Sequence, residues 1–100
     1  MKTVLARTAD VPPGKTLAAK VGDEHLLLCN VEGSIHAIED VCTHDGAQLG
    51  QGVLDGCRIT CPRHGAVFDV TNGNVLVPPA VVPLRTFRVT VIDDMIAVDL

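Results

Sequence analysis

The amino-acid sequence predicts an all-β domain of short antiparallel strands. Turn-forming residues recur at short intervals, the segments between them are rich in Val and Ile, and no apolar period of 3.6 residues persists for three turns. Branched side chains favour strands because they pack well on a pleated surface. A chain of 100 residues with 47% hydrophobic residues is expected to form a single domain, residues 1–100, with no room for a second.

The first expected strands are bounded by clear turn signals. Residues 12–14 (PPG) and 21–23 (VGD) are early turns. Glu32-Gly33 then separates two expected strands, residues 25–31 and residues 34–39. These signals predict short strands separated by turns in the first part of the chain.

The second half of the chain contains three further turn signals. Asp55-Gly56 and Asn72-Gly73 are typical of two-residue hairpin turns, in which both positions need a positive φ. Asp93-Asp94 divides the last apolar segment. The strands expected beside these turns cover residues 53–54, 57–59, 67–70, 75–77, 85–92 and 95–100.

The composition excludes several classes of protein. Eight basic residues are scattered singly in a chain of net charge −4, which argues against nucleic-acid binding. The longest nearly apolar run, residues 75–84, is too short to span a bilayer, and Arg7 interrupts any apolar core of a signal peptide. We therefore expect a soluble, cytoplasmic monomer with no membrane partner, whose four cysteines are ligands or buried thiols rather than disulfides.

Residues 42–52 and 61–65 lack strand character, and each segment contains a cysteine and a histidine. Sixteen residues, including the Asp55-Gly56 hairpin signal, separate the first pair from the second. Because a hairpin reverses the chain, it brings the two loops side by side. The candidate metal ligands are Cys42, His44, Cys61 and His64.

Three interpretations of these side chains compete. The first is that they are unrelated polar residues in loops. The second is that they are the ligands of a structural zinc-binding module, and the third is that they are the ligands of a two-iron cluster. Zinc modules usually pair Cys with Cys and then His with His. Here each loop mixes the two types, which favours a cluster in which one iron takes both cysteines and the other takes both histidines.

The paired motif resembles that of the Rieske [2Fe–2S] proteins. The match consists of residues 42–49 (CTHDGAQL) and residues 61–69 (CPRHGAVFD), supported by the strand rhythm on both sides and by residues 78–80 (PPA). The resemblance implies the Rieske fold, with a basal, sandwich-like part formed by both termini. A smaller cluster-binding part is then expected as an insertion at about residues 40–70.

The resemblance also implies the cofactor and its ligands. One [2Fe–2S] cluster is expected, with Cys42 and Cys61 on the inner iron. His44 and His64 are then expected on the outer iron, near solvent.

Two departures from the respiratory-chain branch of the family are informative. That branch joins its cluster loops by a disulfide, and the corresponding positions are Ala47 and Arg63 here. It also has two hydroxyl side chains that bond to sulfur, where this chain has Ala66 and Phe68. Hydrogen bonds to sulfur raise the reduction potential, so their absence predicts a low-potential, Rieske-type ferredoxin.

The resemblance implies a soluble one-electron carrier rather than an enzyme, similar to the ferredoxin components of bacterial ring-hydroxylating dioxygenase systems. The implied partners are a flavin-dependent NAD(P)H reductase upstream and a terminal oxygenase downstream. Two alternatives remain open: a Rieske-like small subunit of nitrite reductase, and a fragment of an oxygenase. The first is disfavoured by the complete ligand set. The second is disfavoured because oxygenase chemistry needs a separate mononuclear iron site.

Several residues near this motif have simpler interpretations. Cys29 is expected to be a buried strand thiol, and Cys57 is expected on the strand that leads into the second loop. His25 and His36 are expected to be exposed on strands. The acids near the loops are expected either to be solvated or to steer basic partners: Glu39, Asp40, Asp45, Asp55 and Asp69.

Overall fold

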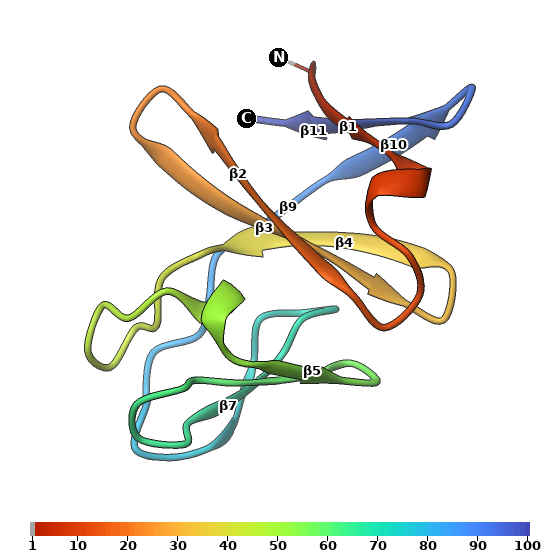
Figure 1. Ribbon diagram of the computed structural model, residues 1–100. Coiled ribbons are helices and arrows are strands. Elements are labelled where there is room, and N and C mark those ends of the chain that lie inside the picture. The colour runs from red at the N-terminus through yellow and green to blue at the C-terminus, as the bar shows by residue number, and fades with distance from the viewer. Residues whose placement is uncertain (1) are drawn as a thin grey trace.

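The computed structural model describes residues 2–100 as an all-β fold, which confirms the predicted fold class (Figure 1). Its strands form three antiparallel sheets. The helices among these residues are two short 3₁₀ turns, η1 (Thr8–Asp10) and η2 (Leu49–Gln51). Within the described part of the chain, no helix has the length and apolar character needed to cross a membrane.

Two of the sheets form the base of the molecule. One has the strand order β1-β11-β10, and the other has the order β2-β3-β4-β9. β1 pairs with β11, so the two ends of the chain lie in one sheet (Figure 1). The strands of the base are β1 (Lys2–Arg7), β2 (Thr16–Val21), β3 (Glu24–Val31), β4 (Ser34–Glu39), β9 (Thr86–Phe87), β10 (Val89–Ile92) and β11 (Met95–Asp99).

The third sheet has the order β5-β6-β7-β8. We call it the inserted sheet, because the chain forms it between β4 and β9. In Figure 1 it lies below the base, in green to cyan, together with the loops that carry the candidate ligands. Its strands are β5 (Val53–Asp55), β6 (Arg58–Thr60), β7 (Val67–Asp69) and β8 (Val75–Val77).

Strand β3 connects two hydrophobic cores. Successive side chains of a strand point to opposite faces. Leu26 and Leu28 therefore pack into the core of the base, whereas Leu27 and Cys29 pack into a second core that includes residues of the inserted sheet. All four side chains are fully buried. This strand lacks a polar face because both of its faces are covered. Through these two faces it packs against the base on one side and against the inserted sheet on the other.

Several of the predicted turns are confirmed, and two of them have a positive φ at both positions. Glu32-Gly33 connects β3 to β4 with φ values of 53° and 95°, and Asp93-Asp94 connects β10 to β11 with φ values of 52° and 64°. Positive φ at both positions gives a twist that matches the flanking strands. The β3–β4 and β10–β11 hairpins therefore follow from these dipeptides.

The prediction of an Asp55-Gly56 turn is wrong by one residue. Asp55 pairs with Arg58, so the two-residue turn is Gly56-Cys57. Within this turn only Gly56 has a positive φ, of 60°, which fits the turn type that needs glycine first. Cys57 consequently lies in the turn and not on the strand that leads into the second loop.

Two further expectations are corrected. Asn72-Gly73 lies in a longer connection, because β7 ends at Asp69 and β8 begins at Val75. The Asp69 carboxylate accepts the Thr71 N–H at 2.9 Å and so shapes this wider turn. The strand expected over residues 85–92 is divided, because β9 pairs with β4 whereas β10 pairs with β11.

Candidate metal centre

Two loops at one end of the inserted sheet carry the four candidate ligands. The first loop, residues 42–47, lies between β4 and η2, and the second loop, residues 61–66, connects β6 to β7. They lie on the same side of the molecule in Figure 1, the first in yellow-green and the second below it in green. The chain reversal at the β5–β6 hairpin brings them together, as predicted from the sequence.

The two loops share one backbone framework. In each, the cysteine N–H donates to the carbonyl five residues later at 2.8 Å. The glycine four residues after the cysteine donates back to the cysteine carbonyl, at 2.8 Å in the first loop and 3.3 Å in the second. Those glycines, Gly46 and Gly65, have φ values of 78° and 77°, a conformation that other residues rarely adopt. The repeated -Gly-Ala- that closes both motifs is therefore the signature of a repeated loop.

The two histidines occupy different positions in the two loops. His44 is two residues after its cysteine, whereas His64 is three residues after its own. The two rings nevertheless meet, with centroids 5.2 Å apart and planes inclined at 86°. The structure thus brings together the imidazoles that the sequence places in separate loops.

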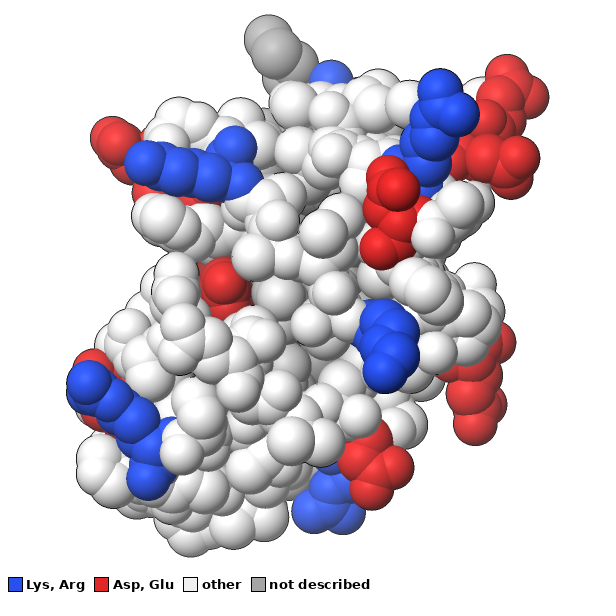
Figure 2. Space-filling model, viewed as in Figure 1, with Lys and Arg blue, Asp and Glu red and all other residues white. Residues whose placement is uncertain are grey.

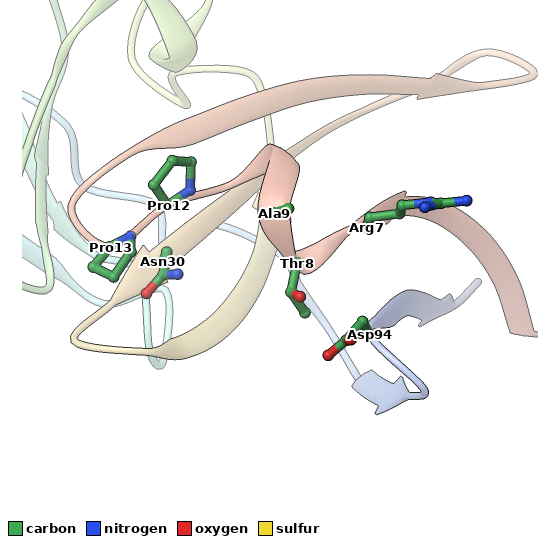
Figure 3. A pocket seen from close by; sticks show the side chains of 7 residues that line it. All are labelled: Arg7, Thr8, Ala9, Pro12, Pro13, Asn30 and Asp94. Atoms are coloured by element: carbon green, nitrogen blue, oxygen red, sulfur yellow. The ribbon is translucent and has the colours of Figure 1, made fainter.

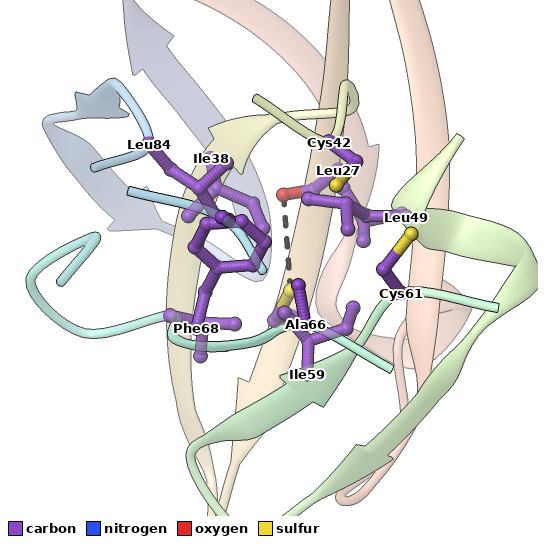
Figure 4. Packing of buried hydrophobic residues seen from close by; sticks show 12 residues of the cluster. Leu27, Ile38, Cys42, Leu49, Ile59, Cys61, Ala66, Phe68 and Leu84 are labelled. Carbon is purple, nitrogen blue, oxygen red and sulfur yellow. Dashed lines mark hydrogen bonds between the residues drawn. The ribbon is translucent and has the colours of Figure 1, made fainter. Parts of the chain in front are cut away.

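The four candidate ligands separate into an inner and an outer pair. Cys42 and Cys61 are 1% and 2% exposed, and Figure 4 shows both at the edge of the core that contains Leu27. His44 and His64 are exposed. Two buried thiols below two exposed imidazoles form the donor set that a Rieske cluster requires, with sulfur on one iron and nitrogen on the other. The residues present therefore fit such a cluster.

The backbone of the first loop favours negative charge on sulfur. Burial raises the pKa of the Cys42 thiol, while the N–H groups of His44 and Asp45 oppose that rise by hydrogen bonding to it. Backbone N–H groups that converge on one anionic atom form a favourable site for it. These two N–H groups would stabilise a thiolate, but burial and the neighbouring Cys61 outweigh them, so the pKa of Cys42 is raised overall.

Side chains outside the ligand set hold the first loop in place. The buried carboxylate of Asp40 accepts the Gly50 N–H at 2.8 Å and closes the base of the loop. Burial raises the pKa of Asp40. On the other side, the Thr43 hydroxyl donates to the Val82 carbonyl at 2.5 Å, which ties the loop to the segment that returns to the base.

Asp45 belongs to the site, although its sequence position suggests only a surface acid. One carboxylate oxygen accepts the Ala47 N–H at 3.0 Å, and the other lies 3.0 Å from His64 Nδ1. The Cys61 sulfur lies 3.9 Å from the first of these oxygens. The Ala47 N–H, and then His64, lower the pKa of this carboxyl. An Asp that precedes Gly-Ala in a tight loop is the signal that could have identified it.

The remaining acids are not gathered around the ligands. The Glu39 carboxylate accepts two hydrogen bonds from Arg85, one from its backbone N–H at 3.1 Å and one from its side chain at 3.2 Å. Asp69 shapes the β7–β8 connection. Asp55 ends β5 beside the hairpin turn. Figure 2 shows charged side chains of both signs scattered over this face, with uncharged surface between them. On the face that Figure 2 shows, the acidic side chains form no continuous patch.

The other cysteines and histidines lie outside the site. Cys29 is fully buried in β3, as predicted, and burial raises its pKa to about 12. Cys57 lies in the hairpin turn. His25 is exposed on β3, as predicted, whereas His36 is only half-buried on β4. None of these four belongs to a group of converging metal-ligand side chains in the described residues.

An open pocket elsewhere on the molecule has no comparable chemistry. It lies against η1 and is lined by residues that include Arg7, Asn30 and Asp94 (Figure 3). The Asn30 amide is already engaged, because it donates to Val11 O at 2.7 Å and accepts the Gly33 N–H at 2.7 Å. The two loops remain the better functional site.

Comparison with known proteins gives the family of the chain. Residues 1–88 match the family model of the Rieske [2Fe–2S] domain. The ferredoxin component of biphenyl 2,3-dioxygenase from Rhodococcus jostii (strain RHA1) is 39% identical over 98 residues, which cover 98% of this chain and 92% of the relative. The ferredoxin of Sphingomonas yanoikuyae B1 superposes with a TM-score of 0.95 at 33% identity, over 100% of this chain and 99% of that one.

A further structural match is a chain in the complex of reduced oxygenase and oxidized ferredoxin of carbazole 1,9a-dioxygenase. It gives a TM-score of 0.92 at 36% identity and covers 97% of this chain and 91% of the matched one. Near-complete coverage in both directions joins the whole chain, and not one motif, to the ferredoxins. The chain belongs to the Rieske [2Fe–2S] family and is a ferredoxin, an electron carrier rather than a catalytic enzyme.

Proposed function

We propose that Cys42, His44, Cys61 and His64 hold one [2Fe–2S] cluster. The carrying observation is the convergence of two buried thiols and two exposed imidazoles from loops of the same backbone framework. Both cysteines bind the inner iron and both histidines bind the outer iron. The first and second loops, with the inserted sheet, make up the cluster-binding part of a single Rieske domain.

The bound cluster stores and releases one electron. The protein supplies the surroundings of that chemistry. The buried cysteines keep water from the inner side of the site, and the exposed rings of His44 and His64 give a partner protein the shortest approach.

The relatives support the proposed partners. This chain receives electrons from a flavin-dependent NAD(P)H reductase and passes them to a terminal oxygenase, as a monomer in the cytoplasm. Support comes from relatives named as ferredoxin components of dioxygenase systems and from the carbazole dioxygenase complex of ferredoxin with oxygenase. The four cysteines are unbridged in the structure, which suits a reducing compartment.

The surroundings of the cluster favour a low reduction potential. Ala66 and Phe68, which occupy the positions of hydroxyl donors in the respiratory branch, are both fully buried and carry no hydroxyl. Rieske centres span roughly −150 to +300 mV, and hydrogen bonds to sulfur raise the value. We expect a midpoint in the negative part of this range.

Metal analysis and voltammetry test the proposal together. Purified protein should be red-brown, contain two irons and two acid-labile sulfides per chain, and show a midpoint below zero at pH 7. It should also relay electrons from a flavoprotein reductase to a Rieske oxygenase. Stoichiometric zinc without sulfide would restore the zinc-module interpretation, and a chain that binds no cluster would restore the nitrite-reductase-subunit alternative.

A further inference from the structure

The longest apolar run of the sequence, residues 75–84, lies largely on the surface of the molecule. It contains no charged or hydrogen-bonding side chain. In Figure 1 this part of the chain, in cyan to light blue, passes the end of the molecule that carries the ligand loops and then returns to the base. We call its exposed residues the apolar strip, which consists of Leu76, Pro78, Pro79, Val81, Val82 and Pro83.

Two buried side chains fix the strip in place. Ala80 and Leu84 belong to the core that also contains the candidate cysteine ligands, and Figure 4 shows Leu84 in this core. Between these two residues, Val81 is 84% exposed and Val82 is 54% exposed. Apolar side chains gain no free energy from burial while they remain in water, so a run of them on the surface indicates an interaction site.

The strip adjoins the first ligand loop. Thr43 is the residue before His44, and its hydroxyl donates to the Val82 carbonyl at 2.5 Å. Val41, which precedes this loop, is also exposed. Apolar surface therefore borders the loop that carries one of the two exposed imidazoles.

Few charges accompany this surface. Within the described ligand loops, Arg63 is the exposed charged residue, because the Asp45 side chain is only 11% exposed. Figure 2 shows a broad uncharged area at the lower end of the molecule, where the strip passes. A partner that fits this face presents apolar side chains to the strip and a carboxylate to Arg63.

We propose that the apolar strip is the docking surface for the terminal oxygenase that receives the electron. This inference rests on the proposed function, which makes the oxygenase a partner of this chain. A protein that covers the strip also lies against the loop of His44, through which the electron leaves. The oxygenase is the favoured occupant because a chain of this fold occurs with the oxygenase in the carbazole 1,9a-dioxygenase complex.

The prolines of the strip suit this role. Pro78, Pro79 and Pro83 each fix one backbone angle and have no N–H to satisfy. A segment that is already rigid loses little conformational freedom when a partner covers it. Apolar contact therefore contributes to affinity with a small entropic cost.

The double variant Val81→Thr/Val82→Thr tests the strip. Threonine keeps the branched shape and adds no charge, and both side chains are exposed, so the fold and the cluster should be unaffected. At a docked surface the two hydroxyls would be buried without partners. Val91→Thr/Ile92→Thr is the matched control, because these neighbouring residues are also exposed but lie on β10 in the base.

The first measurement is the affinity for a terminal oxygenase. Isothermal titration calorimetry uses the oxidised full chain as purified and, as probes, the oxygenases of biphenyl 2,3-dioxygenase and carbazole 1,9a-dioxygenase, two systems with related ferredoxins. The strip variant should raise the Kd by about ten-fold, which corresponds to about 1.4 kcal/mol, whereas the control variant should leave the Kd unchanged. Between about 50 and 300 mM NaCl the Kd should change by less than about three-fold, because screening acts on charges and not on apolar contact.

Several outcomes would overturn the docking surface. They are an unchanged Kd for the strip variant, an equal loss for the control variant, and no binding of the unmodified protein to either oxygenase. Binding does not require electron transfer. A chain that binds through the strip but relays no electron would therefore contradict the proposed function and still support the docking surface.

The second measurement tests whether another copy of this chain covers the strip instead. Sedimentation velocity of the protein alone should show a monomer for the unmodified chain and for both variants. A dimer that Val81→Thr/Val82→Thr dissociates would assign the strip to a second copy and reject the oxygenase as its occupant.

Discussion

The two ligand loops have the same backbone but are held in different ways. The second loop connects β6 to β7, and the neighbouring pair Thr60 and Val67 closes it like the base of a hairpin. The first loop has no such strand pair at its base. It relies instead on side chains, namely Asp40 bonded to Gly50 and Thr43 bonded to Val82.

This difference teaches where the precision of the site comes from. Ladder hydrogen bonds hold the second loop through its flanking strands, and the side chains of Pro62, Arg63 and His64 in the middle of this loop are exposed. Bonds from individual side chains replace that ladder in the first loop. We therefore expect ligand exchange and backbone strain to affect both loops alike, and loss of the anchoring side chains to affect only the first.

The largest expected effect comes from exchanging the ligand type in each loop. His44→Cys and His64→Cys should each lower the midpoint potential by about 200 mV or more, because a thiolate adds negative charge and Cys-ligated clusters of the plant type lie near −400 mV. Voltammetry measures the shift, with iron and sulfide content as the control. If only one of the two variants moved the potential, the loops would not make equivalent contributions to the cluster.

Replacing the two loop glycines tests whether both loops have the same backbone conformation in solution. Gly46→Ala and Gly65→Ala should each destabilise the protein by about 1–2 kcal/mol, because each forces a side chain into the left-handed region. At both positions a Cβ would meet open space, so strain is the only cost. Urea unfolding measures it. Two clearly different losses of stability would contradict the repeated conformation.

Removing an anchor should distinguish the loops. Thr43→Val keeps the shape of the side chain but loses the hydrogen bond to Val82, at a cost of about 1 kcal/mol in unfolding free energy. In the second loop, Pro62→Ala removes only local stiffness and should cost about 0.5 kcal/mol. Urea unfolding of both variants checks the order. The reverse order would mean that the second loop depends more on its own residues than the strand pair at its base suggests.

The smallest effect depends on pH and concerns the buried anchor of the first loop. Because burial raises the pKa of Asp40, the folded state holds its proton more tightly than the unfolded state does. That contribution to stability is fully present below the ordinary carboxyl pKa of 3.8 and is lost as pH rises through the raised value. Asp40→Asn keeps an oxygen for the Gly50 N–H and has no such loss.

Unfolding free energies measured from pH 3 to pH 8 check this sign. Asp40→Asn and the unmodified protein should differ least at acidic pH, and the variant should gain relative to the unmodified protein as pH rises. If the unfolding free energy of Asp40→Asn instead fell relative to that of the unmodified protein as pH rises, the Asp40 carboxylate would stabilise the fold through its charge.

Much of the fold follows from local sequence. The dipeptides Glu32-Gly33 and Asp93-Asp94 place two hairpins correctly because their turns demand a positive φ at both positions. Asp55-Gly56 misleads by one residue, since the turn that forms needs glycine at its first position only. Asn72-Gly73 misleads because the Asp69 side chain shapes a wider turn, a contact that a dipeptide does not reveal.

The sequence by itself determined the types of the candidate ligands, their division between two loops and the hairpin that brings the loops together. These properties are local, because they depend on residue spacing and on turn chemistry. Only the tertiary structure decided which cysteine and histidine atoms face one another, that the two loops repeat one framework, and that Asp45 lies between the ligand pairs. The contact between Asp45 and His64 joins residues nineteen positions apart, on loops whose separation is set by the packing of the inserted sheet on β3. Periodicity and spacing describe neighbours along the chain, whereas a contact of this kind exists only after the two sheets have packed together.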